Sequence, residues 1–328
     1  MKGIEEYTKH NNNAIDTILA NNKSKNYLQG FANHLKLNKS ETTTYNYIRH
    51  IIDFMDFCNN KPLSELEYSD YIAYENKYIE KTSSYRIVKH SALKAFSEYL
   101  FISKKNSVDV MDGVKAPKST QSVETIEKRE NNYLDYDQVQ RLFTTVQNGT
   151  GTHKARARQK DWETRDMAII MTLVNTGMRC SALYKLDVDD INFETQEIRV
   201  KEKGKVQMYF LNDLVLDAIK KWLVDREVLL GDVEEEALFI SNQKQRMCIK
   251  AISNITQKYG KYIKEGVKLT PHKLRATFGT QVYKATGDLY LTQQAMGHSN
   301  TNTTAIYIRG QQKESKIKAA QAMQAFCG

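Results

Sequence analysis

The chain has 328 residues, of which 41% are apolar, and its 48 Lys and Arg against 39 Asp and Glu give a formal net charge of +9. The length favours two domains over one, the apolar content excludes a disordered chain, and the basic excess favours a polyanionic partner. The sequence has no run of 18 apolar residues and no apolar region of a secretory signal, so we expect no membrane span and a cytoplasmic protein. Its four cysteines show no paired spacing, so we expect reduced thiols and neither a disulfide scaffold nor a zinc site.

The first part of the chain predicts a small all-helical bundle. Residues 1–22 are polar and predict a short helix or a loose arm, and helix-like stretches lie near 24–36 and 68–80. Two longer segments, 41–58 and 83–102, carry apolar residues at helical spacing. The apolar faces that we predict there consist of Tyr45, Ile48, Ile52 and Met55, and of Ile87, Val88, Leu93, Phe96 and Leu100.

A polar stretch at 106–132, which contains Gly113 and Pro117, interrupts the helical pattern and predicts an interdomain connection. We therefore assign residues 1–118 to the N-terminal arm and helical bundle, 119–132 to a linker, and 133–328 to a second domain.

The second domain is predicted to be mainly helical with one small β-hairpin. Helical patterns lie at 136–146, at 165–186 as a helix pair, at 213–226, and from about 248 onward. Between them, two β-rich runs at 197–200 and 206–211 flank a turn at 201–205 that contains a glycine, which predicts a hairpin. The fold class is thus mainly α, with a small hairpin or sheet in the second domain.

A basic segment at 149–160 carries Lys154, Arg156, Arg158 and Lys160 and has no sustained apolar face. We interpret it as a flexible surface loop, with direct contact to DNA as the alternative.

Two segments of the second domain place arginines where they can act on a phosphate. In the sequence TGMR, a glycine two residues before Arg179 lets the chain turn and aim the guanidinium outward. In PHKLR, His272 and Arg275 are three residues apart, so a helix that begins at the proline presents both on one face. Taken singly, such residues are common as surface ion-pair partners.

Three further residues complete the set: Lys203 at the predicted hairpin tip, His298 in the sequence GH, and Tyr307 nine residues later. Lys203 and Tyr307 have ordinary readings as well, as a solvated lysine and a half-buried packing tyrosine. Together with the arginines they suit phosphoryl transfer, because guanidinium groups clamp phosphate oxygens, a tyrosine can be the nucleophile, and lysine and histidine can move protons. No pair of carboxylates accompanies these segments to hold magnesium, so we expect neither a metal nor a cofactor.

This order and spacing resemble the tyrosine recombinase, or phage integrase, family. The resemblance covers about residues 133–328 by motif, and the preceding bundle is similar in outline to the family's SAM-like core-binding domain. It implies that Arg179, Lys203, His272, Arg275, His298 and Tyr307 are the catalytic residues. Two departures stand out: Ala182 occupies the position where the family commonly has an acidic residue, and the return strand 206–211 lacks the Arg and Pro often seen there.

The resemblance implies a site-specific DNA recombinase, of integrase or resolvase type, that cuts and rejoins DNA through a 3′-phosphotyrosine. Its partners would be double-stranded DNA and further copies of itself, with four protomers joining two sites. A DNA-binding transcriptional repressor on the same fold is the alternative, which Ala182 favours, and a type IB topoisomerase is a third class with the same chemistry.

The C-terminal segment 313–326 has helix-forming composition, with Ile317, Ala320, Met323 and Phe326 near one face. This face is expected either to pack on its own domain or, as the family resemblance implies, to dock into a neighbouring protomer in an exchange of C-terminal helices.

Overall fold

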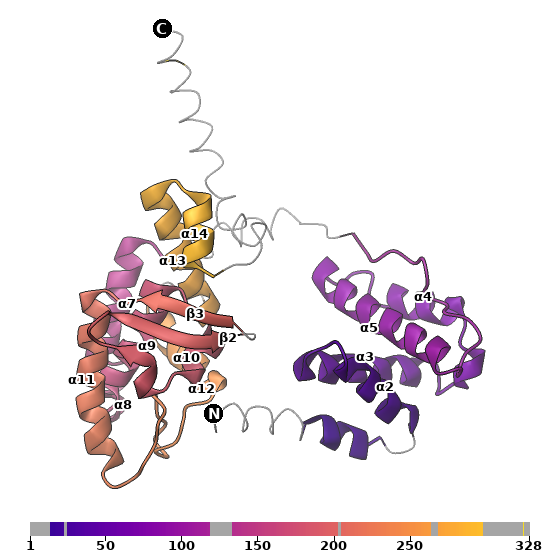
Figure 1. Cartoon of the computed structure of the whole chain (residues 1–328), viewed down its shortest axis with the longest axis horizontal. Helices are drawn as coiled ribbons and strands as arrows, with labels where there is room; N and C mark the ends of the chain where they lie inside the picture. Colours follow the sequence, from indigo (N-terminus) through magenta and orange to yellow (C-terminus); the bar gives the residue numbers. More distant parts are fainter. Residues whose placement is uncertain are drawn as a thin grey trace. The chain divides into compact units, whose positions relative to one another are not determined.

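The structure of the chain is a computed structural model that describes residues 14–22, 25–118, 133–202, 205–263, 268–297 and 324. The chain divides into two compact units, Met1–Ser122 and Val123–Gly328 (Figure 1). Each unit has its own hydrophobic core. Helices dominate both units, and the second contains a small antiparallel sheet, which confirms the predicted fold class. The predicted linker 119–132 lies outside the described residues, as does the predicted C-terminal segment 313–326 except for residue 324. Within the described ranges, no helix is both long and apolar enough to cross a membrane.

The first unit is built from four main helices, and residues 14–20 are also helical. The helices are α2 (Tyr27–Lys36), α3 (Glu41–Phe57), α4 (Tyr68–Asn76) and α5 (Ser83–Ile102), with a short 3-10 turn η1 (Leu63–Glu65). The hydroxyls of Ser40 and Thr82 accept hydrogen bonds from the backbone amides of Thr43 and Tyr85, which fixes the starts of α3 and α5. The helices predicted at 41–58 and 83–102 are confirmed.

The core of the first unit is largely aromatic. Phe31, Phe54 and Phe96 are fully buried, and the Phe31 and Phe96 rings pack edge to face with centroids 5.2 Å apart. One predicted core residue was wrong: Val88 is 46% exposed, because it lies beside the face of α5 that is centred on Leu93 and Phe96.

The polar stretch that follows α5 packs onto the bundle up to residue 118, so its beginning is not a free connection as the pattern suggested. Met111 is fully buried, and its amide donates to the Ser97 hydroxyl at 3.1 Å. The Asn106 side chain donates to the carbonyls of Leu63 and Leu66 at 3.1 and 3.0 Å. Side-chain hydrogen bonds, rather than an apolar stripe, hold this segment, which is why periodicity missed it.

The second unit surrounds helix α9 (Glu163–Thr176), which contacts five other helices. These are α7 (Tyr136–Asn148), α10 (Cys180–Lys185), α11 (Asp213–Leu230), α12 (Ile249–Gly260) and α13 (Pro271–Thr286). Helices α8 (His153–Lys160) and α14 (Leu289–Ala295) and the 3-10 turn η2 (Val188–Asp190) complete the helical elements of the described part.

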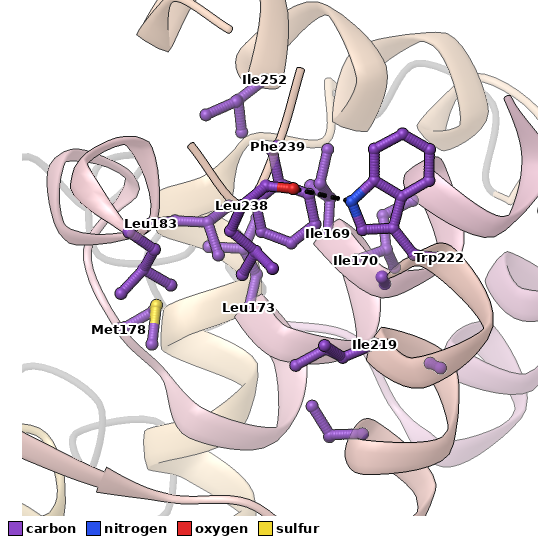
Figure 2. Packing of buried hydrophobic residues seen from close by; sticks show 14 of the residues in the cluster. Ile169, Ile170, Leu173, Met178, Leu183, Ile219, Trp222, Leu238, Phe239 and Ile252 are labelled. Atoms are coloured by element: carbon purple, nitrogen blue, oxygen red, sulfur yellow. Dashed lines mark hydrogen bonds between the residues drawn. The ribbon is translucent and has the colours of Figure 1, made fainter. Parts of the chain in front are cut away.

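Figure 2 shows the centre of this core, where Trp222 of α11 lies near Ile169 and Ile170 of α9. Trp222 is fully buried, and its indole N–H donates to the Leu238 carbonyl at 2.7 Å. The indole therefore fills the core while its one polar atom is satisfied. This packing gives α9 a fixed position from which its C-terminal end can present functional residues.

Three strands form the sheet in the order β1 (Ile191–Asn192), β2 (Glu197–Glu202) and β3 (Lys205–Phe210). Strands β2 and β3 are antiparallel and lie side by side (Figure 1), with Val200 opposite Gln207 and Glu202 opposite Lys205. The predicted hairpin is confirmed; β2 extends two residues beyond the predicted run, and β3 has the predicted length but begins and ends one residue earlier. Side chains alternate along β3: Tyr209 is buried, whereas Val206 and Phe210 are 71% and 65% exposed.

The basic segment that we interpreted as a flexible loop forms helix α8, so this interpretation was wrong. Thr152 caps the helix by accepting from the Ala155 amide at 3.3 Å. The Gln159 side chain exchanges hydrogen bonds with Thr150 at 2.8 to 3.1 Å, which ties the helix to the chain that enters it. No residue of α8, which the structure describes in full, is buried. Local polar bonds build this helix, and hydrophobic periodicity cannot detect them.

A buried charged cluster fixes the N-terminal end of α9. The Asp166 carboxylate, which is fully buried, accepts hydrogen bonds from Arg165 at 2.9 and 3.1 Å, and from Lys258 and Tyr259 at 2.8 Å each. Because Lys258 and Tyr259 belong to α12, the carboxylate joins two helices.

Candidate active site

The first predicted arginine lies at the C-terminal end of α9. Gly177 ends this helix in the left-handed conformation, with φ 60° and ψ 16°, and donates to the Leu173 carbonyl at 3.2 Å. A Cβ at this position would overlap the Phe278 ring, so glycine is required by both conformation and space. The chain then turns, and half-buried Arg179 becomes the N-cap residue of α10.

The second predicted arginine lies in the first turns of α13. The Thr270 hydroxyl accepts from the Lys273 amide at 3.2 Å, and Pro271 occupies the first turn, as the sequence predicted. Within this helix, His272 is exposed and Arg275 is 4% exposed. The helical spacing that places both on one side of α13 is thus present.

The Arg275 guanidinium joins three segments of the second unit. One of its terminal nitrogens donates to the Gly177 carbonyl, two residues before Arg179, and the other donates to the Met296 carbonyl, two residues before His298. A guanidinium suits this task because its planar fork directs several donors at fixed angles. The structure therefore brings the Arg179 turn, Arg275 and the segment leading to His298 together.

The imidazole of His272 lies within the electrostatic reach of Arg275. Partial desolvation and, to a smaller extent, the positive charge of Arg275 lower the pKa of His272 below its ordinary value of 6.5. The ring is consequently neutral at pH 7, the form that can accept a proton.

The hairpin approaches the same region from the other side. Gly297 has φ 59°, and a Cβ at this position would lie 2.7 Å from Oε1 of Gln207 on β3. Lys203, His298 and Tyr307 themselves lie outside the described residues. Of the six predicted catalytic residues, the structure thus places Arg179, His272 and Arg275, and it places the chain that immediately precedes His298.

Ala182, the residue at the family's acidic position, is fully buried in α10. Over the described ranges of the chain, no three His, Cys, Asp or Glu side chains gather as a metal site would require.

A family model of the phage integrase family matches residues 132–314, and one of the phage integrase N-terminal SAM-like domain matches residues 27–104. The chain belongs to the phage integrase family. Tyrosine recombinase XerC from Actinobacillus pleuropneumoniae serotype 7 (strain AP76) is 29% identical over 304 residues, which are 88% of this chain and 91% of that protein. XerC from Haemophilus influenzae strain PittEE is 32% identical over 231 residues, 70% of each protein.

Among solved structures, XerH site-specific recombinase bound to palindromic difH substrate in a post-cleavage complex is similar in fold. Its TM-score is 0.66 at 18% sequence identity, over 85% of this chain and 79% of that one.

The predicted DNA-contacting residues Lys154, Arg156, Arg158 and Lys160 all lie exposed on α8. Lys160 pairs with Glu163, the first residue of α9. This end of α8 is therefore at the opposite end of α9 from Gly177, and fourteen helical residues span about 21 Å. The four cations form a surface separate from the Arg179–Arg275 cluster.

Sequence reasoning missed Met296 and Gln207, which hold the segment before His298. Met296 is fully buried, and its sulfur fills the space that a Cβ on Gly279 would occupy. A glycine inside a helix is a signal of close approach, and Gly279 within α13 could have indicated this contact. Nothing in the sequence distinguishes Gln207 from other polar residues of a strand.

Proposed function

We propose that the protein is a site-specific DNA recombinase that cuts and rejoins DNA through a 3′-phosphotyrosine intermediate. The observation that carries the proposal is the bond from Arg275 to the backbone of the turn that bears Arg179. It brings two arginines of the family motif to one place, where they can act on a single phosphodiester. Relatives named tyrosine recombinase, aligned over most of their length, support the same conclusion.

In this proposal Arg179 and Arg275 bind the two non-bridging oxygens of the scissile phosphate. Guanidinium groups stabilise the charge that increases on these oxygens in the transition state. Burial of Arg275 limits its hydration, so its interaction with an incoming phosphate is stronger than that of a solvated side chain.

Cleavage then proceeds by an exchange of ester bonds. The Tyr307 hydroxyl oxygen bonds to phosphorus, and the bond from phosphorus to the 5′-oxygen breaks. His272, neutral at pH 7, accepts the tyrosine proton, and Lys203 gives a proton to the leaving 5′-oxygen. His298 is a second group that can move a proton at the phosphate. The phosphotyrosine retains the energy of the ester bond, so a 5′-hydroxyl of another strand can reverse the reaction without ATP.

The partner in this proposal is double-stranded DNA, held by both units, and the protein acts in the cytoplasm. The free cysteines among the described residues, Cys58, Cys180 and Cys248, agree with a reducing compartment. The exposed cations of α8 contact DNA phosphates away from the cleaved bond.

Strand exchange requires four protomers to join two sites, and we assign the C-terminal segment to contacts between them. Deletion of residues 313–328 is expected to leave a folded protein that binds one site but no longer joins two. Size-exclusion chromatography with light scattering on DNA measures this loss, and unchanged assembly of the truncated chain contradicts it.

The repressor alternative, which Ala182 favoured, is not favoured by the comparisons, because the relatives above are named as recombinases. A direct test uses a library of randomised duplexes, each with a nick from which a short 5′-hydroxyl fragment diffuses away after cleavage. A recombinase becomes trapped covalently on one sequence class, which is recovered as an SDS-resistant complex and sequenced.

The Tyr307→Phe variant is the matched control in this trapping experiment. It is expected to bind DNA like the wild type and to form no covalent complex, since it lacks only the nucleophilic oxygen. If the wild type also forms none, the enzymatic function is refuted and the repressor is supported. Trapping on many unrelated sequences would support a topoisomerase instead.

A further inference from the structure

We infer that Gln207 is a positioning residue that couples the hairpin carrying Lys203 to the turn that precedes His298. The inference rests on the proposed function, and it concerns how two proton-transferring groups from distant parts of the chain keep their relative positions. Its basis is the contact between the Gln207 amide of β3 and the backbone of Gly297.

The geometry of this contact is specific. A Cβ on Gly297 would lie 2.7 Å from Oε1, 2.8 Å from Cδ and 2.9 Å from Nε2 of Gln207. These near-equal distances mean that the flat face of the amide, rather than its edge, covers the Cα of Gly297. Only glycine permits this approach, and its φ of 59° is also a conformation that other residues rarely adopt.

The same turn is also anchored on α13. The Met296 carbonyl accepts from Arg275, and the fully buried Met296 side chain packs against Gly279. The turn therefore has contacts with both α13 and Gln207. Removal of the Gln207 amide would take away one support of this turn, while the contacts with α13 and the hydrogen bond from Gly297 to Gln294 at 2.9 Å would remain.

The position of Gln207 in the strand indicates that the contact is not incidental. Gln207 lies opposite Val200, which is 4% exposed, and its side chain is on the same face of β3 as the buried Tyr209. A polar side chain that is desolvated without a hydrogen-bond partner costs free energy, and Gln207 is half-buried on this face. Lys203 precedes Gln207 by four residues in the sequence, and we infer that a change in the Gln207 contact affects the alignment of Lys203.

The test measures single-turnover cleavage by Gln207→Ala on the DNA site recovered by covalent trapping. Two forms of the substrate are compared, one with the ordinary 5′-oxygen and one with sulfur in its place. A thiolate leaves without being protonated, so the sulfur substrate does not need a correctly placed Lys203. Because an acid that is displaced loses part of its contribution, we expect Gln207→Ala to cleave the oxygen substrate about 10–100-fold more slowly than the wild type, and the sulfur substrate at the wild-type rate.

Met208→Ala is the matched control, because Met208 is the next residue of the strand and its side chain is 44% exposed on the other face. It is expected to cleave both substrates like the wild type. Gln207→Met keeps the length of the side chain but lacks the flat amide, and it is expected to recover only part of the rate on the oxygen substrate. Gly297→Ala disrupts the same contact by adding a Cβ where the Gln207 amide lies. It replaces Gln207→Ala in the experiment if Gln207→Ala does not fold.

Equal slowing of Gln207→Ala on both substrates, or an equal defect in Met208→Ala, would overturn the inference and leave Gln207 with a purely structural role. Absence of any covalent complex with the wild type, on either substrate, would refute the proposed function instead.

Discussion

The Asp166 cluster allows a quantitative prediction for the stability of the second unit. The substitution Asp166→Ala removes four hydrogen bonds and leaves two cations, Arg165 and Lys258, without their shared carboxylate. It also leaves the hydroxyl of Tyr259, which is fully buried, without its acceptor. Breaking a buried ion pair by removing one partner costs about 3–5 kcal/mol. For a domain of this size, that loss lowers the melting temperature by roughly 6–20 °C.

Tryptophan fluorescence is the appropriate assay, because the two tryptophans of the chain, Trp162 and Trp222, both belong to the second unit. Thermal unfolding followed in this way reports on that unit alone. The control is Asp217→Ala, which breaks an exposed pair with Lys221 on α11, whose side chains are 64% and 67% exposed. Such a pair contributes about 0.3–0.5 kcal/mol. Equal melting temperatures for the two variants would refute the reasoning that burial makes the Asp166 cluster important.

Three further predictions concern the site and the basic helix. Arg179→Ala should reduce covalent trapping by on the order of 100-fold or more, as for loss of a transition-state donor, with DNA binding measured separately by fluorescence anisotropy. The cleavage rate should fall when the pH is lowered through the pKa of His272, which lies below 6.5, because the protonated imidazole can no longer accept the tyrosine proton. A midpoint of the pH–rate profile at or above 6.5 contradicts the role of His272 as the proton acceptor. Replacement of the four Lys and Arg residues of α8 by Gln should reduce the slope of log affinity against log salt by about 0.9 for each phosphate they contact, and an unchanged slope means that α8 does not touch DNA.

The fold could be predicted from the sequence wherever burial creates a periodic pattern. Helices α3 and α5 and the hairpin follow from their apolar spacing and turn residues. Helix α8 and the packed segment after α5 could not be predicted in this way, because side-chain hydrogen bonds from Gln159 and Asn106 hold them instead of apolar contacts. Such bonds depend on which groups meet in three dimensions, and a one-dimensional pattern does not record this.

The candidate site shows the same division. Short spacing within one helix predicted that His272 and Arg275 share a side of α13, and Gly177 predicted the turn before Arg179. The contacts of Arg275 with two backbone carbonyls could not be predicted, since any residue type offers a carbonyl. The positioning role of Gln207 could not be predicted from the sequence either, because it depends on the close approach of a glycine that lies 90 residues later in the chain.

The two ends of α9 are tied down in different ways, and this has a consequence for local motions. Asp166 joins its first turns to α12, and the Gly177 carbonyl just beyond its last turn accepts from Arg275 of α13. A helix that is held at both ends and packed on five neighbours opens only when the whole unit unfolds. In native-state hydrogen exchange, the amides of α9 should therefore be among the slowest of the chain, and those of the hairpin strand β3 should exchange sooner through local opening. The arginine turn would then keep its shape through many cycles of DNA binding and release.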